Sequence, residues 1–348
     1  MEKIQIKIGD VSIGAGAPVS VQSMTNTPTE DVNQTLNQIK ELENAGCDIV
    51  RLAIPDKDCA EAVKEIKNKT NVPLVADIHF DYRLALTVID KGIDALRLNP
   101  GNIGGKEHIK KVVNAAKKRN IPIRIGVNGG SLERYLYYDK SMNLADKMVK
   151  SALEHIKILE ELDFNLIKVS LKSSDVSTMI KAYKKIYDLI PYPLHLGVTE
   201  AGTLRNGIIK SSIGIGSLLS EGIGDTIRVS LTENPIEEVK AAYDILSALN
   251  LRRRGVNFIS CPTCGRCKIN LISLAHKVEQ RFKNLNKPLT IAVMGCPVNG
   301  PNEAKDADYG IAGAIGEGYI FQKGEFVKKV KEEELLDEFE KIVLNDLN

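Results

Sequence analysis

The sequence lacks several features that would place it in a specialised class of protein. It has no tryptophan, only six cysteines in 348 residues, and a net charge of +2 from 47 basic and 45 acidic side chains. No apolar run approaches the roughly 18 residues that span a bilayer, and the first ten residues lack the basic and apolar segments of a signal peptide. We therefore expect a cytoplasmic protein that binds neither membranes nor nucleic acid, because its overall charge attracts no extended polyanion.

Eight short apolar runs alternate with helical patterns through the first 250 residues. This alternation predicts a parallel sheet with right-handed crossovers, and eight units are typical of a closed (β/α)8 TIM barrel of about 250 residues. A doubly wound open sheet is the competing interpretation, but no Gly-rich dinucleotide fingerprint follows Val21. Residues 3–13 alternate with period two, which predicts a hairpin beneath the barrel. The predicted strands are Pro18–Met24, Asp48–Ile54, Pro73–His79, Ala95–Asn99, Pro122–Val127, Leu166–Leu171, Pro193–Val198 and Asp225–Leu231.

The pattern changes after about residue 250. A short basic stretch, Arg252–Gly255, is followed by a cysteine loop, one helical segment and several short strands separated by glycine turns. We predict two domains on this basis. Residues 1–250 form the barrel, which would bind the substrate, and residues 251–348 form a separate α+β domain.

Five of the eight predicted strands carry a cation near the carboxyl end, where the active site of a TIM barrel is built. A single arginine there could form a salt bridge inside the barrel. Five cations exceed the two obvious carboxylates, Asp77 and Glu200. The excess predicts a diphosphate or bisphosphate site, because guanidinium groups bind phosphate oxygens through paired hydrogen bonds. The cations are Arg51, Arg97, Arg124, Lys172 and Arg228, and Asn128 and Ser230 lie at the same strand ends.

The same strand ends supply candidate acid–base groups. Asp77 and Glu200 are candidate general acids or bases, or anchors for substrate hydroxyls. His79 and His195 could share this work, although a single histidine in a barrel is more often a hydrogen-bonded structural residue.

Four of the six cysteines fall within one tenth of the chain. Cys261, Cys264 and Cys267 form a C-x2-C-x2-C motif, and Cys296 is followed by proline, as in many iron–sulfur loops. Zinc is the alternative, but a structural zinc site usually pairs two such knuckles, or one knuckle with two histidines. The C-x3-C-x2-C spacing of radical S-adenosylmethionine enzymes is absent. The two isolated cysteines, Cys47 and Cys59, are expected to pack as small hydrophobic residues.

Ten segments of the chain together resemble the 4-hydroxy-3-methylbut-2-enyl diphosphate synthase family of the methylerythritol phosphate route to isoprenoids. The resemblance runs from about residue 3 to residue 315, in order and without large gaps, and fits the bacterial two-domain form. It implies a TIM barrel followed by a small α+β ferredoxin-like domain, similar to that of sulfite and nitrite reductases, with one [4Fe-4S] cluster. The segments are VQSMTNTPTED, VRLAIP, ADIHFDYRLAL, LRLNPGNIG, IRIGVNGGSL, KVSLKSSD, PLHLGVTEAG, GDTIRVSLT, CPTCGRC and GCPVNGPNEA.

The resemblance also implies roles for individual residues. Cys261, Cys264 and Cys296 match the three thiolate ligands of the cluster, and Glu303 matches the glutamate that binds the fourth iron. Cys267 stands where several relatives have no thiol; we favour Glu303 as the ligand, because a fourth thiolate would close the cluster to substrate. The positions near the reacting hydroxyls are matched by Asp77, Asn128, His195 and Glu200. The positions that hold the diphosphate are matched by Arg51, Arg97, Arg124, Lys172, Arg228 and Ser230.

The implied reaction is the reductive ring opening and dehydroxylation of 2-C-methyl-D-erythritol 2,4-cyclodiphosphate to (E)-4-hydroxy-3-methylbut-2-enyl diphosphate. Two electrons would come from ferredoxin or flavodoxin, and Glu200 or Asp77 would supply a proton. The family also implies a homodimer in which the cluster domain of one subunit covers the barrel of its partner. The alternative is a phosphate-binding TIM barrel whose second domain holds structural zinc and performs no redox chemistry.

Overall fold

The computed structural model describes residues 2–130, 132–296 and 305–347, which fall into two compact units. The first unit extends to Arg252 and the second begins at Arg253. Within the described ranges, every helix is too short or too polar to cross a membrane.

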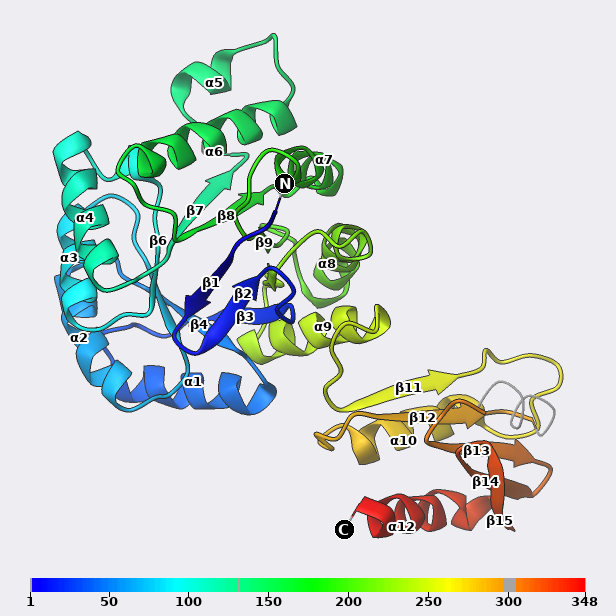
Figure 1. Ribbon diagram of the computed structural model, residues 1–348. Helices are drawn as coiled ribbons and strands as arrows, with labels where there is room; N and C mark the ends of the chain where they lie inside the picture. Colours follow the sequence, from blue (N-terminus) through cyan, green and yellow to red (C-terminus); the bar gives the residue numbers. More distant parts are fainter. Residues whose placement is uncertain (1, 131, 297–304, 348) are drawn as a thin grey trace. The chain divides into compact units, whose positions relative to one another are not determined.

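The first unit is a barrel of eight parallel strands surrounded by helices (Figure 1). Seven neighbouring pairs are hydrogen-bonded in the order β8-β7-β6-β5-β4-β3-β10-β9, and an isolated bridge joins Val169 of β8 to Leu194, the residue before β9. Each predicted run matches one strand, although β7 and β8 extend one residue further than predicted. The order of the strands and this bridge confirm the TIM barrel and exclude the open sheet. The strands are β3 (Ser20–Met24), β4 (Ile49–Ala53), β5 (Leu74–Asp77), β6 (Ala95–Arg97), β7 (Ile123–Asn128), β8 (Ile167–Lys172), β9 (His195–Leu196) and β10 (Thr226–Ile227).

The barrel helices are amphipathic, and several of them begin at a residue whose side chain caps the helix. In the first, the Asp31 side chain accepts a hydrogen bond from the Gln34 amide, and Gly46 ends the helix with a φ of 101° that an L side chain rarely adopts. Buried Ile39 and Leu42 face the sheet. The helices are α1 (Val32–Ala45), α2 (Lys57–Asn68), α3 (Tyr82–Asp90), α4 (Lys106–Lys118), α5 (Arg134–Tyr138), α6 (Leu144–Glu160), α7 (Val176–Tyr187), α8 (Leu204–Leu219) and α9 (Pro235–Ala248).

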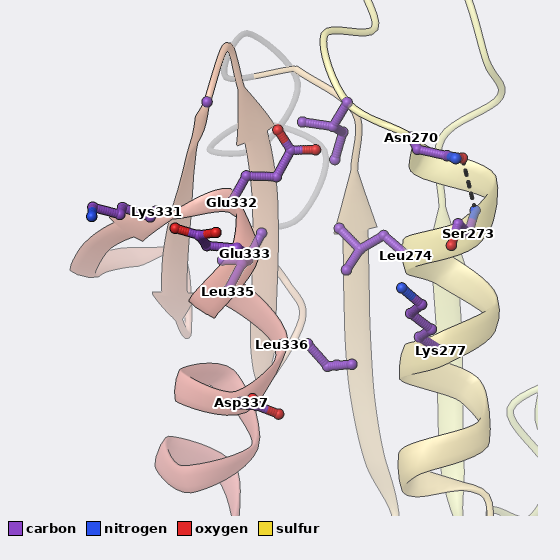
Figure 2. A pocket seen from close by; sticks show the side chains of 12 residues that line it. Asn270, Ser273, Leu274, Lys277, Lys331, Glu332, Glu333, Leu335, Leu336 and Asp337 are labelled. Carbon is purple, nitrogen blue, oxygen red and sulfur yellow. Dashed lines mark hydrogen bonds between the residues drawn. The ribbon is translucent and has the colours of Figure 1, made fainter.

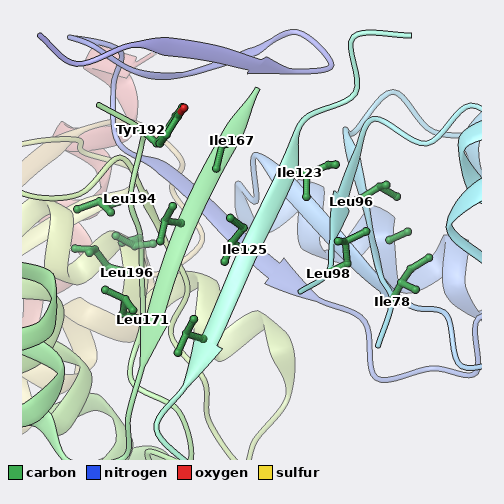
Figure 3. Close-up of a cluster of buried hydrophobic side chains, with 14 of the residues drawn as sticks. Ile78, Leu96, Leu98, Ile123, Ile125, Ile167, Leu171, Tyr192, Leu194 and Leu196 are labelled. Carbon is green, nitrogen blue, oxygen red and sulfur yellow. The ribbon is translucent and has the colours of Figure 1, made fainter. Parts of the chain in front are cut away.

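Apolar side chains of the strands fill the core of this unit, as Figure 3 shows for Ile125 and Leu171 among others. The predicted hairpin is present as antiparallel β1 (Gln5–Ile8) and β2 (Val11–Gly14). Its Ile6, Ile8 and Ile13 pack against residues that begin barrel strands, such as Ile49 and Ala95. The hairpin therefore closes the end of the barrel opposite the carboxyl ends of the strands.

The second unit is an α+β domain, as predicted. Its five strands lie side by side in chain order; the first three are parallel and the remaining pairs are antiparallel. Helices α10 and α12 pack on one face of the sheet, where the rings of Phe282 and Phe339 meet with centroids 5.7 Å apart. The elements are β11 (Val256–Ser260), α10 (Leu271–Phe282), β12 (Leu289–Met294), β13 (Tyr309–Ala314), β14 (Glu317–Gln322), β15 (Glu325–Lys331) and α12 (Leu335–Leu347).

Candidate active site

A basic pocket lies at the carboxyl ends of the barrel strands. The register explains why its residues meet: Asp77 pairs with Arg97 across β5 and β6, and Arg97 pairs with Arg124 across β6 and β7. Parallel strands end at the same edge of a barrel, so side chains at equivalent positions converge on its mouth. Eight of the predicted site residues line this one pocket, namely Arg51, Asp77, Arg97, Arg124, Asn128, Lys172, Arg228 and Ser230.

Asp77 is the carboxylate around which the arginines of this pocket gather. Its oxygens lie 3.4 Å from Arg97 Nη1 and 3.9 Å from Arg51 Nε, and the His79 ring lies 3.3 Å away. Burial on its own raises the pKa of the Asp77 carboxyl. The His79 hydrogen bond and the nearby guanidinium groups outweigh burial and lower that pKa below its ordinary value. Asp77 is therefore an anion at neutral pH.

Arg124 and Lys172 are buried cations that form no direct ion pair with a described carboxylate, although Asp77 lies near enough to Arg124 to attract it. Arg124 is 3% exposed, and its Nε and Nη1 atoms make no hydrogen bond to any described residue. Burial, reinforced by the like charges of Arg51 and Arg97, lowers the pKa of the Arg124 guanidinium. Burial and neighbouring arginines likewise lower the pKa of the Lys172 amine. Both groups would be stabilised by an anion in the pocket.

The charge balance of the pocket differs in one respect from the prediction. Among the described residues, the carboxylates that form ion pairs with its five cations are Asp77 and Glu238. Five positive charges against two negative ones leave a formal excess of three. The expectation that Glu200 is the second balancing carboxylate was therefore wrong, although the predicted excess of positive charge is present.

Two predicted site residues do not line this pocket. Glu200 is exposed on the loop after β9, with a φ of 53°. His195 is fully buried in β9, and its ring nitrogens find no hydrogen-bond partner in the part of the chain that is described. Burial and surrounding cations such as Arg124 lower the pKa of His195, so its ring is neutral.

Sequence reasoning missed several residues at the pocket. Ser170 and Thr199 add hydroxyl groups to its lining, and the pairing carboxylate Glu238 comes from α9. Ser170 could have been found from its position in β8, two residues before Lys172. Glu238 carries no comparable signal, because it lies beyond the last strand and beside a second glutamate.

A second site is formed by cysteines in the α+β unit. Strands β11 and β12 are parallel neighbours, so the loops that follow them begin at the same edge of the sheet. These loops bring together Cys261, Cys264, Cys267 and Cys296, which line one small pocket. The Gly295 amide donates a hydrogen bond to Cys261 Sγ at 3.2 Å, and a hydrogen bond from the Arg266 backbone is the main cause that lowers the pKa of Cys264.

These cysteines fit a thiolate-bound metal centre by their number, their common pocket and the amide already directed at one sulfur. In the ranges described, no three His, Cys, Asp or Glu side chains converge closely enough to hold a metal ion as they stand. The fourth predicted ligand, Glu303, lies outside the described residues. The structure therefore places the four cysteines in one pocket, and the set of four cluster ligands stays a prediction.

A larger hollow of about 610 Å³ lies in the α+β unit, between the start of α10 and the start of α12 (Figure 2). Asn270 accepts a hydrogen bond from the Ser273 amide as the cap of α10. Glu332, Glu333 and Asp337 place acidic groups opposite Lys277. Its mixed charge and lack of converging reactive groups make it a poorer candidate for catalysis than the smaller basic pocket.

A TIM barrel with a basic mouth, followed by an α+β domain with clustered thiols, is typical of an enzyme that combines a phosphorylated substrate with a metal centre. The GcpE TIM-barrel domain matches residues 3–243, and the GcpE protein C-terminal domain matches residues 257–345. The chain belongs to the GcpE family.

Similar proteins extend over nearly the whole chain. The 4-hydroxy-3-methylbut-2-en-1-yl diphosphate synthase (flavodoxin) of Clostridium perfringens is 58% identical over 342 residues, which are 98% of each chain. The enzyme of the same name from Geobacter sulfurreducens is 55% identical over 97% of each chain. Among solved structures, Yersinia pestis dihydropteroate synthase matches 72% of this chain and 98% of its own, with a TM-score of 0.52 and 12% identity. That likeness concerns the barrel fold alone.

Proposed function

We propose that the basic pocket binds a cyclic diphosphate and that the clustered cysteines hold the iron–sulfur centre through which it is reduced. The chain is an oxidoreductase with the activity of its family, the synthesis of 4-hydroxy-3-methylbut-2-en-1-yl diphosphate for isoprenoid biosynthesis. The observation that carries the proposal is the set of five cations at five strand ends around one pocket, which among the described residues form ion pairs with two carboxylates.

The pocket residues have a clear part in this reaction, whose substrate we take to be 2-C-methyl-D-erythritol 2,4-cyclodiphosphate. Arg97, Arg124 and Arg228 would bind its phosphate oxygens through charge-assisted hydrogen bonds, and Lys172 would add a point charge. When the ring opens, one phosphate oxygen leaves the ring carbon and gains negative charge. Preoriented cations stabilise that charge more in the transition state than in the substrate, and they keep the product diphosphate bound.

We assign Cys261, Cys264 and Cys296, together with Glu303, as ligands of a [4Fe-4S] cluster. A cluster held by these residues would supply electrons one at a time and would provide Lewis acidity at the iron that the carboxylate binds. The Gly295 amide that donates to Cys261 Sγ would stabilise the thiolate form of that ligand. Cys267 stays outside the ligand set in this proposal.

Proton delivery falls to Glu200 rather than to Asp77. The lowered pKa of Asp77 makes it a poor proton donor at neutral pH, and its ion pairs make it an orienting group for Arg97 and for a substrate hydroxyl. Glu200 follows β9 at the carboxyl-end side of the barrel and has a solvent-exposed side chain, so it can be reprotonated between turnovers. His195 would contribute to the site as a neutral ring that is buried in the barrel core near the cations.

The electron donor in this proposal is flavodoxin, because the relatives' names include it. We also propose a cytoplasmic homodimer in which the cluster domain of one subunit completes the barrel site of the other. Two subunits would then contribute to each active site.

Anaerobic turnover tests the proposed function. Protein purified without oxygen should be brown, contain about four iron and four sulfide per chain, and convert the cyclodiphosphate when given dithionite. A control with Cys261→Ser should lose iron and turnover together. A colourless protein that is fully loaded with zinc and inactive under these conditions would instead support the phosphate-binding barrel with a structural zinc domain.

A further inference from the structure

Glu238 is a buried carboxylate in the first turn of α9. Pro235 begins this helix, and the Asn234 side chain caps it by accepting a hydrogen bond from the Ile236 amide. Only 4% of Glu238 is exposed. The amino end of a helix favours a negative charge, but a carboxylate this deep also needs hydrogen bonds to replace those lost with water.

Those hydrogen bonds all reach toward the barrel mouth. Oε1 accepts from the Leu231 amide at 3.0 Å, and Oε2 accepts from the Ser23 hydroxyl at 3.0 Å. Arg228 Nη2 lies 3.3 Å from each oxygen. Each carboxylate oxygen therefore accepts from two donors, and the donors come from both the first and the last strand region of the barrel.

The segment from Arg228 to Leu231 needs such an attachment because the sheet no longer holds all of it. Strand β10 pairs with its neighbours only at Thr226 and Ile227. Beyond them, the Arg228 amide still donates to Leu196 at 3.0 Å, and Leu231 is held by Glu238. Ser230 lies between the two residues that Glu238 holds, and both Arg228 and Ser230 line the basic pocket.

We propose that Glu238 is a positioning residue that fixes Arg228 and Ser230 in the geometry that binds diphosphate. It does not line the pocket itself, and it acts by holding one edge of the Arg228 guanidinium while the rest of that group faces the anion. The inference rests on the proposed function, because a diphosphate in this pocket is its premise.

The test compares Glu238→Gln with its neighbour Glu237→Gln. The amide keeps the size of the side chain but has one oxygen that can accept, where two oxygens now accept four hydrogen bonds from three groups, and it removes the countercharge of Arg228. Glu237 shares the same helical turn, yet its partner is Lys240 on the surface, so it controls for the loss of charge at the helix start.

We expect Glu238→Gln to raise the KM for the cyclodiphosphate and the Ki of inorganic diphosphate by about tenfold, the size of one charge-assisted hydrogen bond. The kcat should change less than KM, and Glu237→Gln should match the unmodified chain.

A double-mutant cycle separates positioning from a general structural role. If Glu238 acts through Arg228, Glu238→Gln should have little effect on the Ki of diphosphate in an Arg228→Ala background. Ser23→Ala, which removes one of the four interactions, should raise the Ki two- to threefold and serves if Glu238→Gln folds poorly. A lowered Tm with unchanged KM and Ki, or an equal effect of Glu238→Gln in both backgrounds, would overturn the proposal. Failure of the unmodified chain to bind diphosphate would overturn the proposed function instead.

Discussion

Arg97 Nη1 lies 3.4 Å from the Asp77 carboxylate, and each of the two side chains is only 9% exposed. Breaking a buried pair leaves a charge without its partner, which costs more than the pair contributes. We expect Asp77→Asn to lower the free energy of unfolding at pH 7 by about 3 kcal/mol. Urea unfolding of the two proteins measures this, with Asn in place of the exposed Asp188 as the control.

The same pair predicts a pH dependence. The pKa of Asp77 is lowered in the folded chain, so its stabilisation is complete above the unfolded value of about 4 and is lost as the pH falls toward the folded value. The difference in unfolding free energy between the unmodified chain and Asp77→Asn should therefore be constant above about pH 5 and shrink below about pH 4. A difference that grows on acidification would contradict the ion-pair interpretation.

Substitution of Arg124 should have the opposite effect on stability from substitution of Asp77. It is buried beside other cations, and two of its guanidinium nitrogens lack a hydrogen-bond partner in the described residues. Arg124→Met removes this unfavourable burial, so we expect the Tm to rise by a few degrees. Affinity for inorganic diphosphate should fall about 10- to 100-fold, because a charge-assisted contact is lost.

Calorimetry and a diphosphate titration on the same preparations check the Arg124 prediction. Arg97→Met is the matched control: it should weaken diphosphate binding and also lower the Tm, because it breaks the pair with Asp77. If Arg124→Met lowers the Tm as much as Arg97→Met does, then Arg124 stabilises the fold, and its burial is not an unfavourable feature that serves to bind an anion.

The barrel and most of its basic pocket could be predicted because buried parallel strands appear in sequence as short apolar runs, and polar residues at their ends have one place to converge. The residues that form ion pairs with those polar side chains could not be predicted. Glu237 and Glu238 are adjacent and chemically identical, and the phase of α9 alone decides that one pairs with Lys240 at the surface and the other with Arg228 in the barrel. The burial of His195 likewise depends on which face β9 turns inward.

The cysteine pocket predicts different results for two neighbouring thiols. Cys264 is exposed, whereas Cys267 donates to the Ile269 carbonyl at 3.2 Å and packs with the apolar core of its unit. We expect Cys264→Ala to lose the cluster, and Cys267→Ala to retain about four iron and four sulfide per chain with a slightly lower Tm. Iron and sulfide analysis with the visible absorbance of anaerobic protein distinguishes the two. Cluster loss in Cys267→Ala with retention in Cys264→Ala would reverse the assignment of ligands.

Glu200 combines a role in proton delivery with an unfavourable backbone conformation. Its φ of 53° is one that glycine adopts freely and other residues adopt at a cost. We expect Glu200→Gln and Glu200→Gly to lower kcat by at least about 100-fold, the usual contribution of general acid catalysis, with little change in KM.

Glu200→Gly should leave the free energy of unfolding within about 1 kcal/mol of its original value, because relief of the backbone strain offsets the greater freedom of the unfolded chain. Steady-state kinetics and urea unfolding of both variants, with the exposed Glu233→Gln as control, check this. Unchanged kcat in both would remove Glu200 from the reaction.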